Sequence, residues 1–527
     1  MPTLFDQLFP AERSSRVAVL YEHRQIKYDE LRELTVQSAE TFQALGISAG
    51  DRVAILLHDS PEFIASFVAV ISLGAIAVPI NMALRKEEQF FILNDCGARA
   101  AIVEAAAVPV LFSESTEKTE GTLPALQDLL LVERASDPST LHSIEAIRVQ
   151  AFDEVPRKSL VGEFPSQMKT DSPAFILYTS GSTGEPKGAV HRQSDIFYTN
   201  ETFCAEVLRL REGDRLFSSS RLPFAYGLGN ALTFPLLNGV TTILCREKPA
   251  PEVISRIFAV ERPTICFAVP VVYRMLLDHY RNGHALDTTS LRLCVSAGEA
   301  LPAQIGAAWQ RTFGVEVLDG IGSTEMLHMF ISNHEADVRY GSSGKLLRGY
   351  EARLIDHEGA ATPLGEVGNL WIRGQSAATG YWNRPGTTLE TFVDGWVRTG
   401  DLYRCDRDEF WWHMGRSDDC FKPTGQWVSP VEIEGLLLRT EQVRAAAVVE
   451  GFDENGLSCV CAFVVPEKDR ADAQRTEAEL RAYCAAELPR FKQPRRYIFI
   501  SELPYTATGK VQRFKLREQM RAQRVVV

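Results

Sequence analysis

The segment YTSGSTGEPKG, at residues 178–188, follows an apolar run, FILYT, whose composition predicts a buried β-strand. The glycines and the proline of the segment disfavour both helix and strand, so we expect a loop where the strand ends. Glycines let backbone N–H groups converge on one point, three hydroxyl side chains add donors, and Lys187 adds positive charge. This combination predicts a polyphosphate cradle. It is not a Walker A loop, because Gly188 rather than Ser or Thr follows the lysine.

Outside this loop, apolar strand-like runs alternate with amphipathic helical patterns, from VAILL at 53–57 to LRLCVSAG at 291–298, which predicts stacked βα units. Near Ser343 the pattern changes to short strands with turn residues, which predicts an antiparallel subdomain. After GRSDDCFKPTG, helical and strand patterns predict one small α+β unit. We therefore predict an α/β protein with a large N-terminal domain, residues 1–416, that includes the antiparallel β subdomain, and a small C-terminal α+β domain, residues 417–527.

The apolar segment FIASFVAVISLGAIAVPI, at 63–80, contains no charged residue and reaches the lower limit of a membrane span. Ser, Gly and Pro interrupt it, and Glu62 and Arg85 lie close to its ends. We predict a buried helix that ends near Gly74, followed by a buried strand. The polar segment at 113–122 is predicted to be a surface loop.

Charge and cysteine content exclude several classes of protein. The formal net charge of -12 argues against nucleic acid or an anionic membrane as a partner, so a phosphate-bearing ligand must meet local positive charge. The ten cysteines include no CxxC pair, which predicts free thiols in a reducing compartment; Cys459 and Cys461 alternate along a strand and should share one face. Charged residues near the N-terminus argue against a secretory signal, so we expect a cytoplasmic protein, either monomer or homodimer.

Several motifs occur in a fixed order: the glycine-rich loop, GIGSTE at 320–325, TGDLYR at 399–404, GRSDD at 415–419 and TATGKVQR at 506–513. This series resembles the adenylate-forming superfamily of acyl-CoA synthetases, luciferases and peptide-synthetase adenylation domains over nearly the whole chain. The resemblance implies that Glu325 binds the Mg²⁺ of ATP, that Thr324 lies at the α-phosphate, and that Asp401 binds the ribose with Arg416 behind it. The implied ATP and AMP site is Thr179, Ser180, Gly181, Ser182, Thr183, Gly184, Lys187, Gly298, Glu299, Ala300, Asp319, Gly320, Ile321, Gly322, Ser323, Thr324, Asp401 and Arg416.

The resemblance also implies a two-step reaction with a mobile C-terminal domain. Lys510 is the catalytic lysine of the first step, in which a carboxylate attacks the α-phosphate of ATP; a thiol then attacks the acyl-adenylate. Asp418 matches the hinge of the domain rotation between the steps. Coenzyme A is expected to contact Gly425, Gln426, Trp427, Arg490 and Lys492, the last two within the basic segment RFKQPRR. A solvated basic turn is the alternative interpretation of that segment.

The acid substrate is suggested by FAYGLGNALTFP at 224–235 and GIGSTEMLHMFISN at 320–333, which resemble benzoate-CoA ligases more than acetate or fatty-acid synthetases. Tyr226 with its small neighbours can form a flat slot, Gly322 leaves room for a ring, and His328 can donate a hydrogen bond. The implied acyl site is Phe224, Ala225, Tyr226, Gly227, Gly322, His328 and Met329. Ordinary core packing is the alternative for Tyr226 and His328.

Two prolines depart from the benzoate pattern, Pro223 at the slot and Pro423 after the hinge. We predict that Pro223 widens one side of the slot, so that a 2-aminobenzoate (anthranilate) or 2-hydroxybenzoate competes with benzoate. The leading hypothesis is an ATP-dependent, AMP-forming aryl-CoA ligase. The alternative is a stand-alone enzyme that loads an aryl-adenylate onto a phosphopantetheinyl carrier protein; Arg490, Lys492, Arg495 and Arg496 favour coenzyme A. A catalytically silent homologue is disfavoured because Lys187, Glu325 and Lys510 are all present.

Overall fold

The structure is a computed structural model that describes residues 3–108, 123–132, 147–155, 171–179, 185–356, 358–421, 423, 428–453, 457–467, 473–505 and 511–524. Some predicted features lie outside the described residues. These are Ser180, Gly181, Ser182, Thr183 and Gly184 of the glycine-rich loop, the segment 113–122, Gly425, Gln426 and Trp427 of the expected coenzyme A contact, and Lys510.

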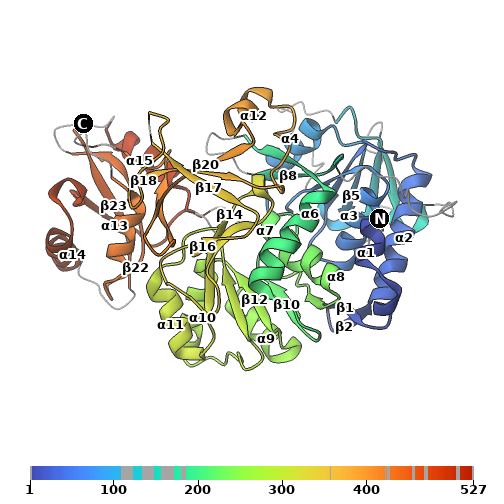
Figure 1. The fold of residues 1–527 in the computed structure, drawn as a ribbon, viewed down its shortest axis with the longest axis horizontal. Helices are drawn as coiled ribbons and strands as arrows, with labels where there is room; N and C mark the ends of the chain where they lie inside the picture. Colours follow the sequence, from blue (N-terminus) through green and yellow to red (C-terminus); the bar gives the residue numbers. More distant parts are fainter. Residues whose placement is uncertain are drawn as a thin grey trace.

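Two mixed sheets with covering helices form the large domain (Figure 1). The first has seven strands in the order β7-β6-β5-β3-β4-β8-β9, all parallel except for the β8–β9 pair. Its strands are β3 (Arg52–Leu56), β4 (Ile76–Pro79), β5 (Ala100–Glu104), β6 (Asp128–Val132), β7 (Arg148–Ala151), β8 (Pro173–Thr179) and β9 (Lys187–Arg192). The parallel βα arrangement confirms the predicted α/β class.

The second sheet has nine strands in the order β16-β15-β14-β13-β12-β10-β11-β1-β2. They are β1 (Val17–Tyr21), β2 (Arg24–Lys27), β10 (Arg215–Ser218), β11 (Thr241–Ile243), β12 (Ile265–Ala268), β13 (Leu293–Ser296), β14 (Val317–Gly322), β15 (Met329–Ser332) and β16 (Lys345–Leu346). Its central strands are parallel, whereas β14–β15–β16 and β1–β2 are antiparallel. The tight turn between β14 and β15 contains the predicted Thr324, Glu325 and His328.

Helices cover both sheets. They are α1 (Leu4–Leu8), α2 (Tyr28–Ala44), α3 (Pro61–Ser72), α4 (Lys86–Cys96), α6 (Gln193–Thr199), α7 (Ala225–Leu228), α8 (Phe234–Asn238), α9 (Pro251–Glu261), α10 (Pro270–Arg281) and α11 (Ala303–Phe313). The π-helical segments η6 (Asn200–Leu208) and η7 (Gly229–Thr233) continue α6 and α7.

The buried helix and strand predicted at 63–80 are confirmed as α3 and β4. Ser60 caps α3 by accepting from the N–H of Phe63 at 3.2 Å, and Pro61 occupies the first turn, where its missing N–H costs nothing. In the described part of the chain no helix combines the length and apolar character needed to cross a bilayer.

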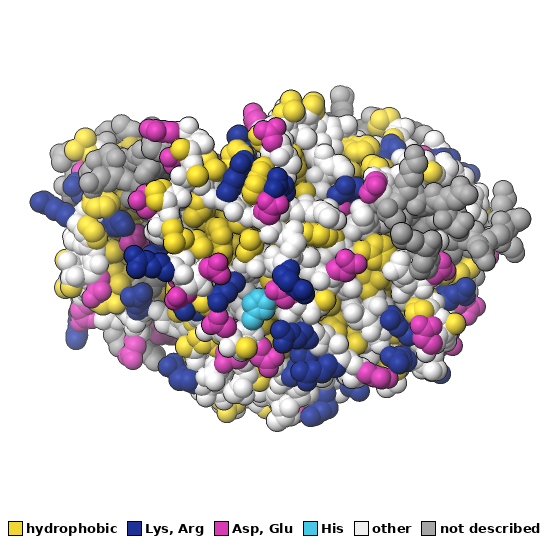
Figure 2. Space-filling view, viewed as in Figure 1, with side chains coloured by type: hydrophobic (Ala, Val, Ile, Leu, Met, Phe, Trp, Pro, Cys, Tyr) yellow, Lys and Arg dark blue, Asp and Glu magenta, His cyan; other side chains and the backbone are white. Residues whose placement is uncertain are grey.

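The antiparallel subdomain is confirmed. Strands β17 (Glu351–Ile355), β18 (Val367–Arg373), β20 (Trp396–Cys405) and β19 (Phe392–Val393) pair in that order, β21 (Trp411–Arg416) pairs with β20, and helix α12 (Pro385–Thr391) lies beside them. On the face shown in Figure 2, acidic and basic side chains are interspersed rather than gathered into one basic field.

The C-terminal residues form a small α+β unit at one end of the molecule (Figure 1). Its described elements are α13 (Pro430–Leu437), β22 (Val443–Phe452), β23 (Ser458–Pro466), α14 (Ala473–Glu487), β24 (Arg496–Phe499) and α15 (Arg513–Arg524). The strands order as β22-β23-β24, and apolar clusters on both faces of this sheet draw only on residues from 421 onward. Cys459 and Cys461 share one face as predicted, with sulfur atoms 3.8 Å apart.

Candidate active site

The glycine-rich segment joins two antiparallel strands. Thr179, the last residue of β8, pairs with Lys187, the first residue of β9, and Tyr178 pairs with Gly188. The predicted loop was therefore too long, since Lys187 and Gly188 belong to a strand. Backbone pairing with β8 outweighs the low strand preference of glycine here, and an added Cβ on Gly188 would lie 2.6 Å from Ile176.

Tyr381, a residue that the sequence analysis did not predict for the site, lies between Lys187 and Glu325 and contacts both side chains. The Tyr381 hydroxyl donates to Oε1 of Glu325 at 2.6 Å, and the ammonium of Lys187 lies 5.8 Å from the centre of the Tyr381 ring. Burial and then the Glu325 carboxylate raise the pKa of Tyr381, so the phenol remains a donor. The tyrosine is brought in by segment 379–382, which pairs with β9 through Ala189. No local motif around Tyr381 indicates this role.

The predicted nucleotide residues converge at the carboxyl ends of β13 and β14. Gly298, Glu299 and Ala300 follow β13, and Asp319, Gly320, Ile321 and Gly322 end β14, followed by Ser323 and Thr324. Carboxyl ends of parallel strands are where open α/β sheets bind ligands. The N–H of Leu301 donates to Asp319 at 3.2 Å, yet burial raises the pKa of this carboxyl to about 8.

The predicted ribose residues also lie together. Asp401 in β20 pairs with Arg416 in β21, with Nη1 3.3 Å from Oδ1, and His413 Nε2 lies 3.7 Å from the same carboxylate oxygen. Gly400 has φ of +75°, and a Cβ there would lie 2.7 Å from the Arg416 guanidinium. Asp401 is thus held in β20, between strands β18 and β21 of the antiparallel subdomain.

His328 is the central residue of the predicted acyl site. It is 3% exposed, and its ring centre lies 4.7 Å from those of Phe203 and Phe234 and 5.6 Å from that of Tyr226. Nε2 lies 3.2 Å from the Asn230 amide oxygen, and no described residue offers Nδ1 a hydrogen bond of normal geometry. Burial lowers the pKa of His328 to about 3, opposed by the backbone of Tyr226. The imidazole is therefore neutral at physiological pH.

Other predicted acyl residues lie on or beside α7 and at the start of β15. Phe224 precedes α7, which contains Ala225, Tyr226 and Gly227, and the Tyr226 hydroxyl donates to the carbonyl of Val295 at 3.1 Å. Pro223 is buried. Met329 begins β15 and packs across Gly320.

The structure gives two glycines of the predicted acyl site a further reason to be glycine. A Cβ on Gly322 would lie 2.5 Å from the His328 carbonyl oxygen, and one on Gly227 would collide with the carbonyl of Arg221. Both glycines therefore permit a close approach of backbone on the side where a Cβ would stand.

In the segment where the sequence predicts a hinge, adjacent residues have different side-chain partners. Ser417 is bonded to β20, because its N–H and its hydroxyl both donate to the carbonyl of Gly400, at 2.9 and 3.0 Å. Asp418 accepts from Arg416 at 3.1 Å, whereas Asp419 pairs with Arg517 of α15 at 2.6 Å. The side-chain ion pairs thus change at Asp418, from Arg416 in β21 on one side to Arg517 in α15 on the other.

The C-terminal unit contacts the large domain at Glu299, one of the predicted nucleotide residues. The N–H of Val511, the residue after Lys510, donates to Oε1 of Glu299 at 3.1 Å. The basic segment is partly engaged in its own unit, because Lys492 pairs with Glu432 at 2.6 Å and Arg495 with Asp453 at 3.0 Å. Arg496 donates to the Phe452 carbonyl, while Arg490 is exposed.

Comparison with known proteins agrees with this geometry. The AMP-binding enzyme family model matches residues 7–382, and the model of the AMP-binding enzyme C-terminal domain matches residues 432–510. The chain belongs to the AMP-binding enzyme family. It is 39% identical to a benzoate–CoA ligase of Thauera aromatica over 96% of this chain and 93% of that protein.

Two solved structures share the fold closely. A crystal structure of an anthranilate CoA ligase in complex with anthranoyl-AMP superposes with a TM-score of 0.89 at 35% identity, covering 98% of this chain and 97% of that one. A benzoate CoA ligase from Burkholderia xenovorans LB400 gives 0.87 at 36% identity, covering 98% and 100%. Within its family, the chain is thus an AMP-forming aryl-acid CoA ligase.

Proposed function

We propose that this ligase activates a small benzoate-type acid with ATP, releasing pyrophosphate, and then transfers the aryl group from AMP to coenzyme A. The observation that carries the proposal is that the turn between β14 and β15 holds both Glu325 and His328. Glu325, which Tyr381 orients, and His328, which the aromatic rings enclose, are three residues apart on this turn. A carboxylate bound beside His328 is thereby directed toward an α-phosphate held near Thr324 and Glu325.

The residues around Glu325 fit a magnesium ion bound together with ATP. Tyr381 occupies one carboxylate oxygen, and in the described residues no cluster of three or more His, Cys, Asp or Glu forms an all-protein metal site. Mg²⁺ commonly takes one or two carboxylates and completes its shell with phosphates and water, so a single glutamate suits it. The ion would supply charge neutralisation at the phosphates.

Attack of a carboxylate on the α-phosphate joins two anions, so the protein contributes positioning and positive charge. We assign Lys187 and the loop donors Thr179, Ser180, Gly181, Ser182, Thr183 and Gly184 to the β- and γ-phosphates. Asp401 and Arg416 hold the ribose. Residues 298–300 and 319–323 line the adenine and α-phosphate side, and Lys510 bridges carboxylate and α-phosphate.

We assign the domain boundary to Asp418, with residues 1–416 holding both small-molecule sites and residues 417–527 rotating between half-reactions. The switch of partners from Ser417 to Asp419 supports this hinge. The Val511–Glu299 hydrogen bond supports an adenylation arrangement, since it brings the residue beside Lys510 to the nucleotide side. After rotation, Gly425, Gln426 and Trp427 would approach pantetheine, and Arg490 and Lys492 the phosphates of coenzyme A. Lys492 would have to exchange Glu432 for phosphate.

Among benzoates, we propose that ortho-substituted acids, 2-aminobenzoate or 2-hydroxybenzoate, compete with benzoate. His328 is neutral, its buried Nδ1 has no hydrogen bond of normal geometry within the described residues, and Pro223 lies buried next to Phe224 at the same end of α7. A neutral donor or acceptor buried among aromatic rings selects for a polar ring substituent, because an unmatched polar group would be left unpaired.

The test is a panel of benzoate, 2-, 3- and 4-amino- and hydroxybenzoates and phenylacetate with ATP, Mg²⁺ and coenzyme A, with aryl-CoA and aryl-AMP both followed by mass spectrometry. We expect thioester from a benzoate, with an ortho-substituted acid competing. Benzoate preferred over both ortho acids would refute the role of Pro223. Accumulation of aryl-AMP without thioester would instead indicate transfer to a carrier protein.

Lys510→Ala separates the half-reactions. We expect it to abolish pyrophosphate exchange while leaving thioester formation from synthetic aryl-AMP and coenzyme A intact, because the lysine acts in the first step alone. Lys515→Ala, at an exposed position on α15, is the matched control. Unchanged exchange in Lys510→Ala would contradict the assigned role.

A further inference from the structure

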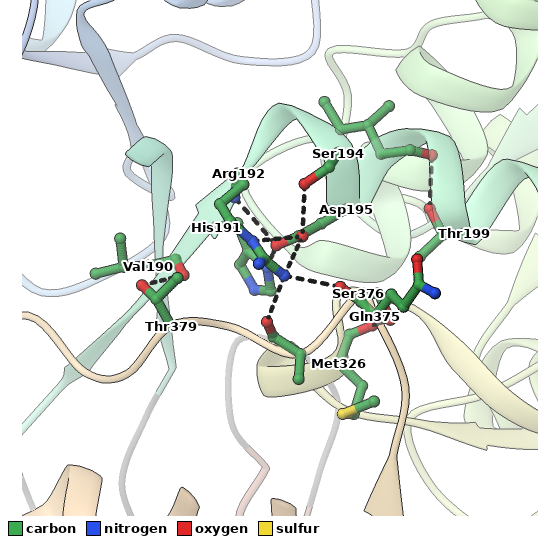
Figure 3. A network of polar contacts seen from close by, with 12 residues as sticks. Val190, His191, Arg192, Ser194, Asp195, Thr199, Met326, Gln375, Ser376 and Thr379 are labelled. Atoms are coloured by element: carbon green, nitrogen blue, oxygen red, sulfur yellow. Dashed lines mark hydrogen bonds and ion pairs between the residues drawn. The ribbon is translucent and has the colours of Figure 1, made fainter. Parts of the chain in front are cut away.

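A buried histidine–aspartate pair lies directly behind the catalytic turn. His191 is in β9 and Asp195 is in the first turn of α6, and both side chains are fully buried. Nδ1 of His191 lies 2.9 Å from Oδ2 of Asp195 (Figure 3). The aromatic ring of Phe175 stacks on the imidazole, with ring centres 5.3 Å apart and planes 19° from parallel, which holds the imidazole in one orientation.

The second nitrogen of His191 reaches the catalytic turn itself. Nε2 lies 2.8 Å from the backbone carbonyl oxygen of Thr324. A backbone carbonyl oxygen only accepts hydrogen bonds, so Nε2 of His191 donates to Thr324, while Nδ1 and the Asp195 carboxyl group share a second hydrogen bond. The imidazole therefore fixes the peptide that joins Thr324 to Glu325.

Asp195 extends the same network to the other side of Glu325. It accepts from the backbone N–H and from Nε of Arg192, both at 3.0 Å, and the Arg192 guanidinium donates to the carbonyls of Gln375 and Ala377 at 2.7 and 3.2 Å (Figure 3). The next residue, 378, donates its N–H to the Glu325 carbonyl at 2.8 Å. Two consecutive carbonyls of the turn thus accept hydrogen bonds: that of Thr324 from His191 in β9, and that of Glu325 from residue 378.

We propose that His191 and Asp195 are positioning residues for Thr324 and Glu325, acting through the Thr324 carbonyl without touching substrate. Small displacements of groups that hold a reacting phosphate slow the reaction steeply, so an anchored peptide matters for adenylation. Thioester formation does not use the metal ligand. The pair should therefore affect the first half-reaction selectively. This inference rests on the role proposed above for Glu325.

Two substitutions at one position separate positioning from simple structural support. A glutamine amide can place its N–H near the position of Nε2, and an asparagine amide places its N–H near that of Nδ1. His191→Gln therefore retains the donor to Thr324, whereas His191→Asn retains only the donor to Asp195. Asp195→Asn keeps the shape of the aspartate but removes its charge.

The experiment measures ATP–pyrophosphate exchange with benzoate, the KM for MgATP, and thioester formation from synthetic benzoyl-AMP and coenzyme A. We expect exchange to fall about tenfold or more in His191→Asn, with a raised KM for MgATP, and to recover to within about threefold in His191→Gln. Asp195→Asn should resemble His191→Asn. Thioester formation from benzoyl-AMP should stay within about twofold of the parent protein in all three.

The control variant is Asp214→Asn, which replaces another buried carboxylate, one that pairs with Arg292 at 2.7 Å. Asp214 lies at the amino end of β10, whereas the turn with Thr324 and Glu325 lies at the carboxyl end of β14. It should lower thermal stability without this selective loss. Equal losses in both half-reactions, or equal exchange in His191→Asn and His191→Gln, would overturn the proposal. Glu325→Gln is measured in parallel: if it retains full exchange, the assigned role of Glu325 fails, independently of the histidine.

Discussion

Burial of one histidine, His328, should by itself lower the stability of the folded protein as the pH falls. The folded state holds its pKa at about 3, against 6.5 for the ordinary side chain, because burial disfavours the charged ring. Below pH 6.5 the unfolded chain binds a proton that the folded protein does not. The resulting loss of stability begins as pH falls through 6.5 and is complete near pH 3. At pH 5 it amounts to about 2 kcal/mol, from about 1.4 kcal/mol per pH unit.

The assay is urea unfolding at pH 7 and pH 5, followed by tryptophan fluorescence, for the parent protein and His328→Gln. Other titrating groups contribute similarly to both proteins, so the difference between their pH dependences isolates His328. His328→Gln should lose about 2 kcal/mol less between these pH values. The exposed His23→Gln is the matched control and should follow the parent. Parallel pH dependences of the parent and His328→Gln would refute the reasoning.

Three substitutions test other parts of the site. Tyr381→Phe removes the 2.6 Å hydrogen bond to Glu325 and should lower pyrophosphate exchange about tenfold, whereas unchanged exchange and KM for MgATP would show that the phenol does not orient the carboxylate. Gly322→Ala forces the turn away from the His328 carbonyl and should destabilise the protein by about 1–3 kcal/mol in thermal unfolding while impairing acid binding. Asp319→Asn should flatten the stability profile between pH 5 and 8. The folded carboxyl, with its pKa near 8, keeps a proton that the unfolded chain has already released, so stability falls as pH rises through this range; an unaltered profile would refute the assignment.

Local patterns of sequence predicted much of this molecule correctly. The apolar segment at 63–80 became α3 and β4, because an uncharged run interrupted by small residues and proline suits a buried helix and strand better than a membrane span. The change of pattern near Ser343 became the antiparallel subdomain. These features depend on periodicity and backbone preference, which neighbouring residues determine.

Other features depended on partners distant in the chain. Lys187 was expected in a loop but is in β9, because it pairs with Thr179 of β8. This pairing outweighs the low strand preference of the glycine and proline beside Lys187. Lys492 was expected to face a phosphate, and in this structure its ammonium is paired with Glu432, sixty positions earlier. No pattern within a short window reveals which charge will be its neighbour.

The sequence by itself determined the order of βα units, the glycine-rich loop, the ordered motifs and hence the adenylate-forming chemistry, because each depends on residue types at short spacing. Only the tertiary structure decided that Tyr381 orients Glu325, that His191 and Asp195 hold the peptide after Thr324, and that His328 is neutral. The physical reason is that hydrogen-bond partners and desolvation are set by which segments pack together, and that packing joins residues more than a hundred positions apart.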